Sequence, residues 1–171
     1  MADKTKSVFE TLNEINVNDK TERKGNLTYL SWAFAYAEAK KAYPDMTYQV
    51  YERETQYGLV NYFTDGKTCW TKVGVTINGQ EHIEMLPVMD FSNRSIPLEK
   101  VTSTDVNKAI QRCLTKAIAR HGLGLYIYAG EDLPEAEKEK MEIPDQPPVK
   151  EFKRPGKSSG AVETVDGVPG W

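Results

Sequence analysis

Four basic residues recur every fourth position within residues 104–121, a segment whose apolar spacing predicts an amphipathic helix. They are Lys108, Arg112, Lys116 and Arg120. At about 100° per residue, a four-residue step drifts only about 40°, so these side chains form one slanted ridge. No acidic residue follows Asp105 within the segment, so no Glu–Lys pair at i,i+4 neutralises the ridge. A cationic row about 18 Å long matches the charge spacing of an extended phosphate backbone, although an ordinary solvated helix face shows charges too.

Other basic and aromatic residues could extend such a site. Further cations lie on predicted strands and loops, at Arg53, Lys67, Lys72 and Arg94, where each also fits an ordinary solvated charge. The chain has nine tyrosines and three tryptophans, and exposed rings can stack on nucleobases. Strands also favour aromatic residues for packing, and we predict that Trp32 and Trp70 belong to the core.

Several other chemistries find little support in the residues. Cys69 and Cys113 lack a CxxC neighbour or a nearby histidine at metal-ligand spacing, which argues against zinc. Neither His82 nor His121 has a recognisable serine or aspartate partner, and His121 fits a helix C-terminus better. The run 156–158 resembles the end of a P-loop, but Glu151 stands where its first glycine is needed.

A metal-dependent nuclease is the main enzymatic alternative. Pro44-Asp45 followed by Glu52-Arg53-Glu54 is close to a PD-(D/E)xK site. The last position requires lysine, which helps to stabilise charge at the phosphate, and here it is Glu54. Cleavage of single-stranded DNA that depends on Mg²⁺ would decide for this alternative.

The elements that must position the ridge give an α+β fold. We predict an antiparallel β-meander of three to four strands over 47–54, 58–64, 68–77 and 80–88, with tight turns at Asp65-Gly66 and Asn78-Gly79. The long helix, capped by Ser103 or Thr104 and ended by Gly122, packs across this sheet.

Helical segments are predicted both before and after the strands in the sequence. A short helix is expected over 7–14, and a longer one over 27–45, capped by Thr28 or Ser31 and ended by Pro44. Residues 123–129 should return along the sheet or the long helix. A short charged helix is predicted over 131–141.

Charged residues are distributed unevenly along the chain. Residues 1–130 hold 16 Lys and Arg against 15 Asp and Glu, whereas residues 131–171 hold 6 against 10. The second part is also rich in proline and glycine, so we expect a disordered tail. No apolar run approaches the roughly 20 residues needed to span a bilayer, and two lone thiols fit a reducing compartment. We therefore expect a cytoplasmic protein without a membrane partner.

Three stretches resemble phage single-strand annealing proteins of the Sak type. They are YLSWA at 29–33, LPVMD at 86–90 and HGLGLYIYAGEDL at 121–133. The Sak type is similar to a wider superfamily that includes the eukaryotic Rad-type annealing protein and phage Erf and Red-beta. The resemblance covers about residues 8–135, so we expect an annealing domain over 1–135 and a flexible acidic tail over 136–171.

The resemblance implies a non-enzymatic protein that needs neither ATP nor another cofactor. Protomers would assemble into a ring or filament in a bacterial host cell, with single-stranded DNA in a basic groove. The groove residues implied are Lys108, Arg112 and Lys116, with Arg120 at the end of the row. Lys67, Lys72 or Arg53 from the hairpins would add a second contact, and Arg94 is a further DNA-binding candidate by its charge alone.

A protein-interaction module is the third class. The tail ends in Val168-Pro169-Gly170-Trp171, whose terminal aromatic could dock a partner such as a host single-strand-binding protein. The same tail could be an inert solubilising segment that competes for the basic groove. Deleting residues 142–171 and measuring partner capture and DNA affinity would separate these interpretations.

Overall fold

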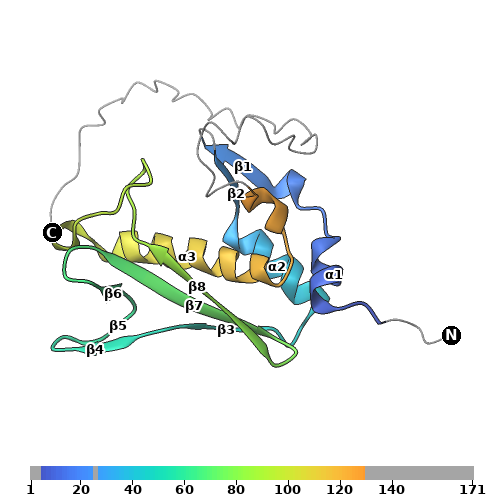
Figure 1. Ribbon diagram of the computed structural model, residues 1–171, viewed down its shortest axis with the longest axis horizontal. Coiled ribbons are helices and arrows are strands. Elements are labelled where there is room, and N and C mark those ends of the chain that lie inside the picture. Colours follow the sequence, from blue (N-terminus) through green and yellow to red (C-terminus); the bar gives the residue numbers. More distant parts are fainter. Residues whose placement is uncertain (1–4, 25–26, 130–171) are drawn as a thin grey trace, which may run out of the picture.

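The computed structural model describes residues 5–24 and 27–129 of the 171-residue chain (Figure 1). The predicted helix over 131–141, the tail and the run that resembles a P-loop lie outside the described residues.

A four-stranded antiparallel sheet forms the centre of the molecule. Its middle strand, β7 (Cys69–Ile77), pairs along its length with β8 (Gln80–Pro87). On its other side β7 pairs with β3 (Thr47–Val50) and, further along, with the short β6 (Phe63–Thr64). Asn78 and Gly79 have φ angles of 49° and 79°, the left-handed pair that a two-residue hairpin requires. The predicted meander is confirmed, and β4 (Arg53–Thr55) and β5 (Gly58–Val60) add a separate hairpin.

The long helix α3 (Ser103–Arg120) packs across β7 and β8, as predicted (Figure 1). Alternate residues of β7, among them Val73 and Val75, point toward α3 and are fully buried. The cap lies one residue earlier than expected. Thr102 accepts a hydrogen bond from the Asp105 amide, and the Asp105 carboxylate accepts one from the Thr102 amide. This reciprocal capping box satisfies two amide groups at the helix end, which neither Ser103 nor Thr104 does.

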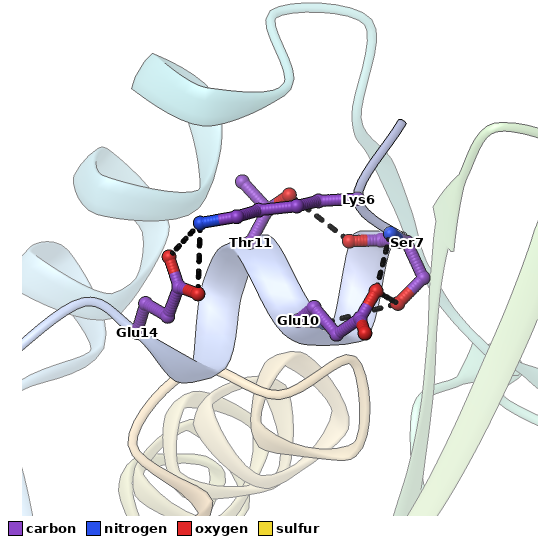
Figure 2. A network of polar contacts seen from close by, with 5 residues as sticks. All are labelled: Lys6, Ser7, Glu10, Thr11 and Glu14. Atoms are coloured by element: carbon purple, nitrogen blue, oxygen red, sulfur yellow. Dashed lines mark hydrogen bonds and ion pairs between the residues drawn. The ribbon is translucent and has the colours of Figure 1, made fainter. Parts of the chain in front are cut away.

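The short helix α1 (Val8–Asn13) confirms the predicted N-terminal helix. Ser7 caps it in a capping box with Glu10, and Lys6 forms an ion pair with Glu14 at 2.6 Å (Figure 2). The helix lies against the end of α3, where Gly122 has a φ of 122°. A Cβ there would lie 2.6 Å from the Phe9 carbonyl oxygen, so this position requires glycine for both its backbone angle and its space.

The prediction of one helix over 27–45 was wrong in its first turn. Residues 27–30 form β2 (Leu27–Leu30), which pairs with the unpredicted β1 (Thr21–Lys24), and α2 (Trp32–Ala42) begins only after Ser31. The Ser31 side chain makes no capping hydrogen bond. Residues 27–30 pair with β1 as a strand, and this pairing overrides the helical spacing of their apolar residues. The helical spacing therefore forms a helix only from Trp32 onward.

Three single-turn 3₁₀ helices complete the described structure. They are η1 (Asn18–Lys20), η2 (Leu98–Lys100) and η3 (Leu125–Tyr128). The last contacts both α3 and β2, so the predicted return along the long helix is confirmed. The Tyr126 hydroxyl accepts a hydrogen bond from the Val17 amide at 3.2 Å and so ties η3 to the N-terminal segment.

The two tryptophans differ from their prediction as core residues. Trp32 is 45% exposed at the start of α2. Trp70 is half-buried and stacks on Phe63 at 6.3 Å, on the sheet face that points away from α3. Sequence spacing alone does not reveal which side of a helix or sheet another element covers.

Candidate nucleic-acid interface

The basic ridge lies along the part of α3 that faces away from the sheet. Lys108 is exposed, and Arg112 is half-buried with its guanidinium carbon 5.2 Å from the centre of the Tyr29 ring on β2. The Lys116 ammonium lies 5.3 Å from the centre of the Tyr128 ring on η3. Strand β2, which is distant in sequence, and η3, which follows α3 closely, therefore place aromatic rings against the helix and orient two of its cations.

The fourth cation has a carboxylate partner. Arg120 forms an ion pair with Glu84 of β8, which is mostly buried. This pair was not visible in the sequence, because an i,i+4 pattern detects partners on the same helix only. Within the described residues, Lys108 and Arg112 form no ion pair, and the acidic residue nearest to Lys108 in the helix, Asp105, is held in the helix cap.

Three adjoining hollows run beside the ridge and share lining residues, so they form one open groove, which we call the α3 groove. Trp32 and Gln111 belong to the two hollows nearest Arg112. Asn61 and Asn107 belong to the two nearest the start of α3. The middle hollow has a volume of about 410 Å³. The groove lies between α3, the start of α2 and the strands β3 and β5, and Glu22 of β1 and Tyr29 of β2 line its end at Arg112.

Aromatic and amide side chains line the middle of the α3 groove. Tyr48 is 50% exposed and meets Tyr36 edge-on, with ring centres 5.9 Å apart, and Trp32 completes the aromatic wall. Asn61, Asn107 and Gln111 face the same hollow. Their side-chain amides make no hydrogen bond within the described part of the chain. The groove therefore offers unused donors and acceptors next to exposed rings.

The other predicted cations lie away from the groove or have partners. Lys72 lies on the opposite sheet face, over the ring of Tyr51 at 4.5 Å. Arg94 pairs with Asp90 at 3.5 Å. Arg53 donates a hydrogen bond to the Tyr62 carbonyl, and Lys67 is exposed in the turn before β7. Of the predicted basic residues, the structure brings together only those of α3.

Cys69, Cys113 and His121 are buried as packing groups. Burial raises the pKa of the Cys113 thiol to about 11, and desolvation also raises that of Cys69. His121 is buried, with Nε2 2.8 Å from the Val75 carbonyl oxygen, and burial lowers its pKa. Its place at the end of α3 was predicted, but burial favours the neutral ring over the dipole-stabilised cation.

The acidic residues of the nuclease alternative lie far apart. Asp45 precedes and Glu52 follows β3, and an extended strand rises about 3.3 Å per residue, so their Cα atoms are separated by roughly 15 Å or more. Among the described residues, no three His, Cys, Asp or Glu side chains are grouped to hold a metal ion.

The described chain is an α+β protein whose long helix carries cations beside an aromatic-lined groove, and the charged residues that line this groove are Arg112, Glu22 and Glu52. This groove is the candidate binding surface of the described residues. The family model of the Sak single-strand annealing protein matches residues 6–156, and the chain belongs to this family. No curated protein matches the sequence. None of the described helices has the length and apolar character required to cross a membrane.

Proposed function

We propose that the chain binds single-stranded DNA along the α3 groove and anneals complementary strands without a nucleotide cofactor, during homologous recombination of a phage in its bacterial host. The single observation that carries this proposal is the pair Lys108 and Arg112, which has no carboxylate partner among the described residues: Arg112 lines the α3 groove, and Lys108 is exposed one helical turn before it. Membership of an annealing family supports the same activity.

The mechanism follows from charge neutralisation. Lys108, Arg112 and Lys116 contact successive phosphates and release their counterions, which gives sequence-independent affinity. The bound strand is held extended, and most of its bases remain open to a complementary strand. Base pairing supplies the driving force, because the protein has removed part of the repulsion between the two backbones. No bond is made or broken, so the protein acts as a binder and not as an enzyme.

Residues 1–135 form the annealing domain in this proposal, and residues 136–171 a flexible acidic tail that could contact a host single-strand-binding protein. Removing residues 142–171 should abolish capture of that protein while leaving annealing of bare strands in place. Loss of annealing on truncation would assign the tail to the DNA-binding part.

Self-association into a ring or filament is part of the same proposal. Two apolar patches on different parts of the molecule support it. Met85, 58% exposed, and Ile83 lie on the sheet face opposite α3, while Leu59, 68% exposed, and Tyr57 lie on the β4–β5 hairpin. Contact between two different patches of identical chains is head-to-tail and propagates into rings or filaments. Met85→Glu should shift the mass measured by light scattering toward the monomer.

The direct test is an annealing assay with complementary oligonucleotides and no nucleotide. Wild type should accelerate duplex formation, and the Arg112→Ala/Lys116→Ala variant should lose most of this activity while retaining a cooperative unfolding transition. At 0.1 M salt, each lost single-strand phosphate contact costs roughly fivefold in affinity, so two cost roughly 25-fold. Equal annealing by both proteins would remove α3 from the mechanism.

A further inference from the structure

The middle of the α3 groove has features that phosphate binding does not use. It is lined by the rings of Trp32, Tyr36 and Tyr48 and by Asn61, Asn107 and Gln111, whose side-chain amides form no hydrogen bond with any described residue. None of these groups carries a positive charge. Its volume, about 410 Å³, equals that of roughly a dozen water molecules, which is room for a planar heterocycle.

The amides stand in a fixed relation to the ridge. Asn107 and Gln111 each precede a ridge cation by one residue, so they form a parallel row about 100° around the helix from Lys108 and Arg112. Within each row the step is about 6 Å along the axis. A strand whose phosphates follow the cation row therefore directs its bases toward either the amide row or the solvent.

We propose that the trough formed by Trp32, Tyr48, Asn61, Asn107 and Gln111 binds an unstacked nucleobase of the DNA strand held on the α3 ridge. This inference rests on the proposed function and adds a base-contacting site to it. The base stacks on the exposed indole or phenol ring, and its edge exchanges hydrogen bonds with the amides. Amide side chains carry both donors and acceptors, so they suit any base edge. A base in the trough must leave it to pair, so the site holds the strand before annealing.

The first test compares two ligands with wild-type protein. A labelled oligothymidylate competes with a strand of equal length whose bases are replaced by abasic sites. The proposal expects the thymine strand to bind tenfold or more tightly, the typical effect of one stacked base. Equal affinity would overturn the base site and leave the phosphate ridge intact. Failure of both strands to bind would overturn the proposed function and the base site together.

The second test uses variants. Trp32→Ala should bind the thymine strand no better than the abasic strand and should keep wild-type affinity for the latter. Trp32→Phe retains a ring and should keep most of the preference, and Trp70→Phe, on the other sheet face, should keep all of it. Equal losses of Trp32→Ala for both strands would show that Trp32 only supports the ridge, which would overturn the proposal.

A third measurement does not require loss of the indole. The chain has three tryptophans, so Trp70→Phe/Trp171→Phe leaves Trp32 as the only one. Its fluorescence should be quenched by the thymine strand and not by the abasic strand. Absence of quenching at saturating thymine strand would overturn the stacking contact.

Discussion

The two sides of the central sheet carry similar pairs of cation and tyrosine, yet they differ in charge balance. On the outer face, Lys72 lies over Tyr51, and the Tyr51 hydroxyl donates a hydrogen bond to Glu81 at 2.6 Å. On the side of α3, Arg112 lies over Tyr29, and no carboxylate of the described residues pairs with it. The outer group is internally neutral, whereas the inner one retains its charge.

The comparison indicates that a basic side chain stacked on an aromatic ring does not by itself make a phosphate-binding site. An aromatic ring orients the side chain at a modest gain of about 0.5–1 kcal/mol, and the remaining charge decides whether an anion is attracted. Glu81 raises the pKa of the Tyr51 phenol through its hydrogen bond, so that ring also stays neutral across the physiological range. The outer face is therefore suited to packing against protein, and the side of α3 to binding an anion.

The largest effect is expected when the positive charges on the α3 side of the sheet are removed. Replacing Lys108, Arg112 and Lys116 together by glutamine should weaken binding of single-stranded DNA roughly 100-fold at 0.1 M salt. It should also flatten the slope of log affinity against log salt by about two, because single strands give about 0.7 per phosphate contact. Fluorescence anisotropy over a salt series measures both quantities.

The matched control removes three positive charges elsewhere. Lys67, Lys72 and Arg94 replaced by glutamine change the net charge equally, so both variants share the same long-range electrostatic loss. If this control weakens binding as much as the α3 variant does, the second contact predicted for these residues is the main one, and the α3 groove is not the principal site.

Much of this comparison could be predicted from the sequence, because the relevant signals are local. The dipeptides Asp65-Gly66 and Asn78-Gly79 predicted the hairpin turns, and the four-residue spacing of basic residues predicted the ridge on the long helix. The ring beneath Arg112, the carboxylate at Arg120 and the trough at Trp32 come from elements far away in the chain. Spacing within one element contains no information about which distant side chain packs against it. The mispredicted start of α2 has the same cause, since pairing with β1 is a long-range contact.

The second prediction tests the tyrosines that orient the cations. Tyr29→Ala should weaken binding of single-stranded DNA about two- to fivefold, because Arg112 loses the ring that positions it. Tyr29→Phe retains the ring and should bind as wild type does, and Tyr51→Ala on the outer face should have no effect. A loss with Tyr51→Ala similar to that with Tyr29→Ala would contradict the distinction between the two sides.

The third prediction concerns a variant without the Glu84 carboxylate, which neutralises the positive charge of Arg120. Glu84→Gln keeps the size of the side chain and a hydrogen-bond acceptor but releases one positive charge beside the ridge. Affinity for single-stranded DNA should rise about twofold at low salt, because the released Arg120 charge is itself 54% exposed and screened by solvent, and the gain should vanish at high salt. On the outer face, Glu81→Gln is the matched variant and should leave affinity unchanged.

The smallest effect is expected from pH. It should distinguish the α3 groove from the histidine pair His82 and His121. Burial, together with the neighbouring His82 ring at 4.3 Å, lowers the pKa of His121 below its ordinary value of 6.5. As the pH falls below about 6.5, the unfolded chain therefore binds a proton that the folded protein resists, and the free energy of unfolding decreases. Urea midpoints at pH 7.5 and 5.5 should show this decrease in wild type and a smaller one in His121→Asn. DNA affinity should stay constant over the same range, because neither His82 nor His121 lines the α3 groove. If affinity falls in parallel with stability, the histidine pair and the groove are coupled, and the ridge does not act as an independent binding surface.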